Sequence, residues 1–186
     1  MTRLQLLVAI IGSLLFASCI GSGYKYLTEG EKQRVVLCNE PIGSLTNDGK
    51  VWLVSIEQMQ EFLKASGKVL VYEYASFCKS DHCLSPTVVE DDCTKAGIRF
   101  CLVAESYDGI FNIPVRTTPI LAIEPTALGK KIGRDCSKAF FDRLTGTTWK
   151  TRGYGRYYLF ADGTFCGCYN DYQDALNPFN AKNIIQ

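Results

Sequence analysis

The run Val69–Ala75 constrains the fold more than any other stretch of the sequence. It is β-branched, aromatic and largely apolar, which is typical of a strand buried on both faces of a sheet. Helix and strand patterns alternate around it: strands are expected at 51–54, 98–104 and 117–123, and helices at 55–67, 85–97 and 137–144. This order predicts an α/β fold, with a central sheet flanked by helices. A chain of 186 residues suits one such domain with extensions.

The tail follows a different pattern. Residues 155–169 predict a β-hairpin, because two aromatic runs are joined through Asp162-Gly163, an Asp-Gly turn. We expect residues 146–186 to form a C-terminal hairpin extension packed on a domain at 50–145. Residues 19–49 are expected to form a spacer and a short helical segment.

The N-terminus indicates export. Arg3 precedes the apolar run Leu4–Phe16, and two small residues then lead to Cys19, so residues 1–18 have the three regions of a signal peptide in order. The run is shorter than the roughly 20 residues that a membrane-spanning helix needs. Residues 16–19 resemble the lipobox of bacterial lipoproteins, which implies lipidation of Cys19 and a periplasm-facing protein anchored in the cell envelope. The alternative is ordinary cleavage before an unmodified Cys19.

Composition narrows the class of partner. Nine cysteines in 186 residues are typical of an exported, disulfide-containing protein. Lys and Arg number 20 against 19 Asp and Glu, and no basic run exceeds two residues. We therefore expect no nucleic-acid partner.

Two cysteines lie where a catalytic loop would lie. Cys78 and Cys83 follow the predicted buried strand and precede a helix, and Thr118-Pro119 opens a later strand. This arrangement resembles the thioredoxin family over roughly residues 52–144. The resemblance implies a thioredoxin-like sheet, with Cys78 as the attacking thiol and Cys83 as the resolving thiol. It also implies that Phe77 takes the position of the family's Trp, and that Thr118 and a cis-Pro119 face the loop and shape a substrate groove.

The loop departs from the family pattern, because four residues separate the two cysteines where the family has two. If Ser85 caps the following helix, both cysteines precede it; if Asp81 does, Cys83 enters its first turn. His82, the only His of the chain, is favoured as an exposed loop residue. The alternatives are that it donates to a thiolate, carries a proton, or joins Cys78 and Cys83 in holding a soft metal. We expect no metal and no other cofactor.

The other cysteines are expected to be structural, either in disulfides or as buried thiols. Cys166 and Cys168 lie on the same side of a strand, so each is expected to pair elsewhere, with Cys136 one such partner. A Cys-x-Cys redox or metal site is the alternative.

The sequence therefore predicts a membrane-tethered extracytoplasmic protein that exchanges disulfides with protein thiols or disulfides. The competing hypothesis is a non-catalytic lipoprotein that uses the same fold as a binding or structural module. The sequence indicates neither the substrate nor the direction of exchange.

Overall fold

The structure is a computed structural model that describes residues 23–76, 84–129 and 133–177. The predicted signal peptide, the cysteine loop from Phe77 to Cys83 and the end of the tail lie outside these residues.

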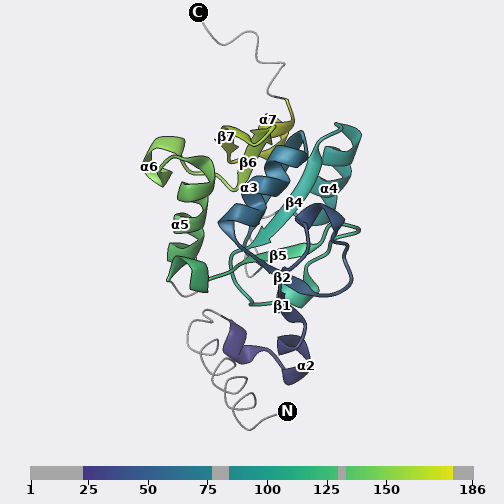
Figure 1. The fold of residues 1–186 in the computed structure, drawn as a ribbon. Coiled ribbons are helices and arrows are strands. Elements are labelled where there is room, and N and C mark those ends of the chain that lie inside the picture. The colour runs from purple at the N-terminus through teal and green to yellow at the C-terminus, as the bar shows by residue number, and fades with distance from the viewer. Residues whose placement is uncertain (1–22, 77–83, 130–132, 178–186) are drawn as a thin grey trace, which may run out of the picture.

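A seven-stranded sheet organises the described residues, in the order β1-β2-β5-β4-β3-β6-β7 (Figure 1). Its strands are β1 (Val35–Leu37), β2 (Val51–Val54), β3 (Lys68–Tyr74), β4 (Arg99–Ala104), β5 (Ile120–Ile123), β6 (Tyr157–Ala161) and β7 (Thr164–Tyr169). The first five in this order are parallel to one another, whereas β6 pairs antiparallel with β3, and β7 pairs antiparallel with β6. The predicted α/β class is confirmed.

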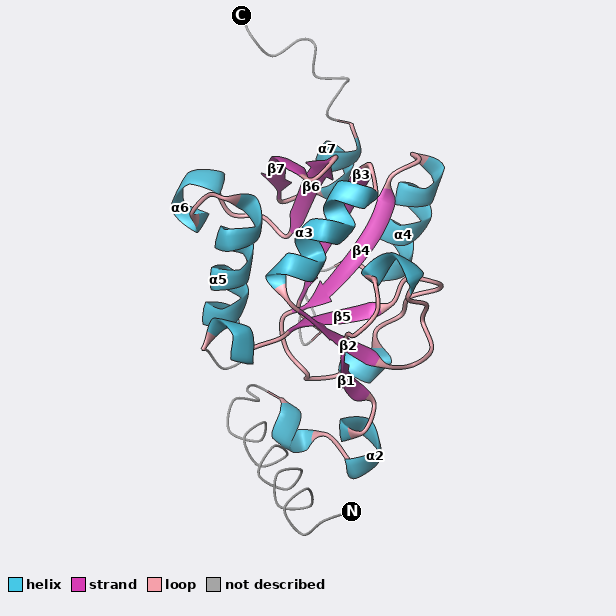
Figure 2. Cartoon of the chain, viewed as in Figure 1, coloured by secondary structure: helices cyan, strands magenta, loops and turns pink. Residues whose placement is uncertain are grey.

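Helices cover both faces of the sheet (Figure 2). The α-helices are α2 (Glu29–Lys32), α3 (Ile56–Ala65), α4 (Pro86–Lys95), α5 (Arg134–Thr145), α6 (Trp149–Arg152) and α7 (Tyr172–Leu176). The 3-10 helices are η1 (Tyr24–Tyr26), η2 (Ile42–Ser44), η3 (Ile110–Asn112) and η4 (Thr126–Leu128). The sequence explains where the longer ones begin. Ser55 and Gln58 form a capping box at α3, and Pro86 occupies the first turn of α4.

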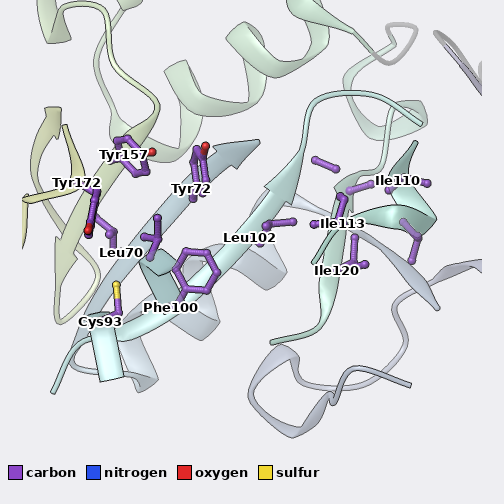
Figure 3. Packing of buried hydrophobic residues seen from close by; sticks show 14 of the residues in the cluster. Leu70, Tyr72, Cys93, Phe100, Leu102, Ile110, Ile113, Ile120, Tyr157 and Tyr172 are labelled. Atoms are coloured by element: carbon purple, nitrogen blue, oxygen red, sulfur yellow. The ribbon is translucent and has the colours of Figure 1, made fainter. Parts of the chain in front are cut away.

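Two hydrophobic cores lie on opposite faces of the sheet. Alternate residues of β3 divide between them, since Leu70 and Tyr72 pack on the face covered by α4 and α7 (Figure 3). Val69 and Val71 pack on the other face, where α3 and α5 contribute their apolar sides. This burial on both faces is what the apolar run 69–75 predicted.

The tail is part of the sheet itself. Tyr157–Ala161 pairs with β3, so the sheet crosses the boundary expected at residue 145. Strands β6 and β7 are joined by Asp162 and Gly163, whose φ angles of 49° and 78° fit the predicted Asp-Gly turn. Strand β1 was not predicted, because three residues are too few to show a period. Helix α5 begins three residues before the expected Ser137.

Candidate functional site

The cysteine loop is bracketed by described residues although it is not itself described. Strand β3 ends at Tyr74, beside Glu105 at the end of β4, and α4 starts at Pro86 with Ser85 as its N-cap. Both Cys78 and Cys83 therefore precede the helix in sequence, which settles the choice between Ser85 and Asp81 as the cap.

Pro119 does not lie where the resemblance implied. None of the peptide bonds between described residues is cis, so the predicted cis bond between Thr118 and Pro119 is wrong. Ile120 pairs with Leu102, whereas Tyr74 pairs with Ala104. Pro119 therefore lies at the amino end of the parallel strands, about 10 Å along them from the end of β3 and two strands away. The position of Pro119 was predicted wrongly because β5 runs parallel to β3. The first residues of β5 therefore lie toward the amino ends of the strands, and not beside the carboxyl end of β3.

Thr118 is held by a carboxylate instead of facing a substrate groove. It is buried, and both its backbone N–H and its hydroxyl donate to Oε1 of Glu90, at 2.9 and 2.8 Å. The same oxygen accepts from the N–H and hydroxyl of Thr117, and Oε2 accepts from the Arg116 N–H at 2.8 Å. Burial alone would raise the pKa of Glu90, but these hydrogen bonds outweigh it and lower the pKa. Glu90 thus fixes the segment before β5 to α4, and a substrate-binding role for Thr118 has no support.

A different segment lies beside the carboxyl end of β3. The carbonyl of Arg156, just before β6, accepts from the Glu73 N–H at 2.8 Å, and the Arg156 N–H donates to the Tyr169 carbonyl at 3.0 Å. Gly155 has no room for a side chain, because a Cβ there would lie 2.5 Å from the Tyr169 oxygen and 2.7 Å from Sγ of Cys168. Gly155 and Arg156 are therefore packed closely against β7, and Arg156 also borders the end of β3.

Glu73 is a largely but not fully buried acid at this end of the sheet. Its carboxylate accepts hydrogen bonds from the hydroxyl of Ser137 on α5 and from the hydroxyl of Tyr158 on β6, the latter at 2.7 Å. Burial raises the pKa of Glu73 above its ordinary value, and the two hydroxyls offset this only in part. Glu73 was not among the site residues predicted from the sequence, although a single acid inside an apolar strand was a visible signal.

Three of the described cysteines are poor nucleophiles because they are buried or partly buried. Burial raises the pKa of Cys93 and of Cys101 to about 12, and that of Cys168 to about 11. Cys166 is exposed on β7. Neither Cys166 nor Cys168 is disulfide-bonded, so the suggested pairing with Cys136 is not found.

Two absences hold for residues 23–76, 84–129 and 133–177. Within those ranges no group of three or more His, Cys, Asp or Glu side chains could hold a metal ion. No helix there is long and apolar enough to cross a bilayer.

Comparison with known proteins gives no match. No family model fits the sequence, and neither a characterised protein nor a solved structure is similar to it.

Proposed function

We propose that this chain is a membrane-tethered, extracytoplasmic thiol–disulfide exchange protein with a thioredoxin-like domain. The observation that carries the proposal is the place of the cysteine loop, which joins the carboxyl end of the interior strand β3 to the start of α4. In α/β sheets, ligand sites lie outside the carboxyl ends of the strands.

The proposed chemistry uses two thiols and no cofactor. The Cys78 thiolate attacks one sulfur of a substrate disulfide, forming a mixed disulfide and releasing the other substrate sulfur as a thiolate. The Cys83 thiolate then attacks Sγ of Cys78 and releases the second substrate thiol. The substrate is reduced, and the two electrons come from the Cys78–Cys83 dithiol, which becomes a disulfide. The reverse sequence oxidises a substrate dithiol.

In this proposal residues 153–156 border the exchange site, in the place expected of Thr118-Pro119. They precede an antiparallel strand, β6, that pairs with β3, so they lie at the edge from which the cysteine loop departs. Within this segment Gly155 is packed tightly against β7, whereas the side chain of Tyr154 is exposed.

One observation favours the competing hypothesis of a non-catalytic module. The Thr118–Pro119 bond is trans and lies at the amino end of β5, away from the carboxyl end of β3, so the element that most favoured an enzyme from the sequence is missing from the site. A module of this kind would keep Cys78 and Cys83 as a permanent cross-link.

Trapping of a mixed disulfide distinguishes the two. The Cys83→Ser variant should accumulate disulfide-linked adducts in the cell envelope, because Cys78 attacks but is no longer released. The adducts should disappear on reduction and in Cys78→Ser/Cys83→Ser, as seen on non-reducing gels. Cys166→Ser is the matched control, since it removes an exposed thiol of β7 and should trap nothing. Absence of adducts, together with resistance of Cys78 to alkylation after mild reduction, would leave the binding module.

Membrane tethering is tested separately. The full-length protein should incorporate labelled fatty acid, and Cys19→Ala should abolish incorporation, because two or more acyl chains on that residue would anchor the chain stably. Label that persists in Cys19→Ala would refute lipidation at this position.

A further inference from the structure

A second feature at the carboxyl edge of the sheet is independent of the cysteines. A cavity of about 590 Å³ opens between the ends of β3 and β4, helices α5 and α6, and strand β6. Small-molecule sites commonly have volumes of roughly 300–1,000 Å³, so this cavity is large enough for a compact organic ligand.

Basic and aromatic side chains dominate the cavity wall. Arg134 and Lys138 lie one turn apart on α5, and Arg152 and Arg156 line the side formed by α6 and the segment before β6. Trp149 and the largely exposed Tyr154 stand at the wall with their ring centroids 5.3 Å apart. An anion with a flat apolar body would find charge and aromatic surface together here.

Arg152 brings a buried positive charge whose hydrogen-bonding capacity is only partly used. Its side chain is 4% exposed, and one terminal nitrogen is paired with Asp142. Its Nε is buried and has no hydrogen-bond partner among residues 23–76, 84–129 and 133–177. Buried polar groups are normally satisfied, so this guanidinium nitrogen is a donor that awaits an acceptor from outside the described residues.

Arg156 is also incompletely engaged. Its Nη1 lies 3.4 Å from the carbonyl oxygen of Glu73 and 3.5 Å from a carboxylate oxygen of Glu105. Both distances are at the outer limit of a hydrogen bond, whereas close charge-assisted bonds of this kind are about 2.7–2.9 Å long. The guanidinium is 39% exposed, so it can turn toward a ligand at little cost.

The acidic residues of the wall limit the charge of the ligand. Glu73, Glu105 and Asp135 line the cavity against the four basic residues. Glu73 is engaged by two hydroxyls on the sheet side, and Asp142 already neutralises part of Arg152. The excess of positive charge is therefore small and suits a single carboxylate better than a polyphosphate.

We infer that this cavity binds a small organic carboxylate with a planar apolar body. Arg156 and Arg152 bind the carboxylate group. The rings of Trp149 and Tyr154 contact the planar body. Arg is the residue suited to such a task, because its guanidinium matches the two oxygens of a carboxylate. Binding in this cavity does not require Cys78 or Cys83, so its test is independent of the test for disulfide exchange.

Benzoate is the probe for the test, and benzamide is its neutral counterpart of nearly the same shape. The chain has two tryptophans, so Trp52→Phe leaves Trp149 as the only one, and its fluorescence reports the cavity. Benzoate should bind the full-length protein with a Kd on the order of 1 mM, since so small a ligand makes few contacts. Benzamide should bind at least about tenfold more weakly, because the charge-assisted bonds are lost.

Variants then locate the contact. Arg156→Gln should weaken benzoate binding about tenfold. The Kd of Arg156→Lys should lie between those of Arg156→Gln and the parent, because lysine keeps the charge but cannot donate to both carboxylate oxygens as a guanidinium does. Arg143→Gln is the matched control: it removes the same charge from an exposed position on α5 outside the cavity wall, and it should leave the Kd unchanged. The inference is overturned if benzamide binds as well as benzoate, if Arg156→Gln and Arg143→Gln have equal effects, or if benzoate does not bind.

Discussion

Glu90→Gln is expected to lower the free energy of unfolding by about 3 kcal/mol at pH 7, the scale for removing one partner from a buried, charge-assisted network. One carboxylate oxygen of Glu90 accepts four hydrogen bonds from Thr117 and Thr118, and the other accepts the N–H of Arg116. An amide cannot serve all of them, because its NH₂ group would face a donor. Chemical denaturation measures the change.

Asp91→Asn is the matched control for Glu90→Gln. Asp91 is the next residue of α4 and also contacts Arg116, but its ion pair is exposed, with Nε to Oδ1 at 2.8 Å. An exposed pair contributes about 0–1 kcal/mol, so Asp91→Asn should change stability by no more than that. Equal losses of unfolding free energy in the two variants would mean that the hydrogen bonds of Glu90 do not hold the segment before β5 to α4.

The pH dependence of stability gives a second readout for Glu90. Its folded pKa is lowered, so its contribution is fully present above the unfolded value near 4.5 and is lost as pH falls through the folded value. The parent should therefore lose stability below pH 4.5 more steeply than Glu90→Gln. Parallel acid profiles would contradict the assignment.

Sequence patterns predicted the elements that have local signals. The capping box of α3, the Pro at the start of α4 and the Asp-Gly turn between β6 and β7 each depend on residues within a few positions of one another. The alternation of strands and helices gave the α/β class for the same reason.

The position of Thr118-Pro119 could not be obtained in this way. Sequence spacing showed that a strand follows these residues, but not whether that strand runs parallel or antiparallel to β3. The direction is set by pairing between β5 and its neighbours β2 and β4, which are distant in sequence. Reversing the direction of a strand moves its first residue from one end of the neighbouring strands to the other. Pro119 therefore does not lie in the site predicted for it.

The role of the tail was missed for a related reason. The pattern of β6 and β7 indicated two strands, yet nothing in it specified β3 as the partner of β6. That pairing places residues 153–156 and Tyr158 beside Glu73. The cavity and its basic wall follow from this one long-range contact, and no local motif marks them.

Glu73→Gln should change stability in the opposite direction to Glu90→Gln, although each replaces a glutamate that is wholly or largely buried by its amide. We expect the free energy of unfolding at pH 7 to rise by about 1–3 kcal/mol, which is the usual cost of a buried polar group without full hydrogen-bond compensation. Among the described residues, the Glu73 carboxylate accepts hydrogen bonds from the hydroxyls of Ser137 and Tyr158, and hydroxyls can also rotate to accept from an amide. Little is therefore lost in the substitution, and the ionisation of a buried acid no longer opposes folding.

The direction of this change follows from the difference in the pKa of Glu73 between the folded and unfolded states. Burial raises the folded pKa of Glu73, so the parent has no penalty below the unfolded value near 4.5 and loses stability as pH rises from there to the folded pKa. The two proteins should have similar stabilities near pH 4 and should diverge above it, with Glu73→Gln the more stable. Ser137→Ala serves as the control: it removes one hydrogen bond to the carboxylate, favours the neutral acid further and should steepen the parent's loss with rising pH. A Glu73→Gln variant that is less stable at pH 7 by the same amount as Glu90→Gln would show that the Glu73 carboxylate is ionised and stabilising in the fold.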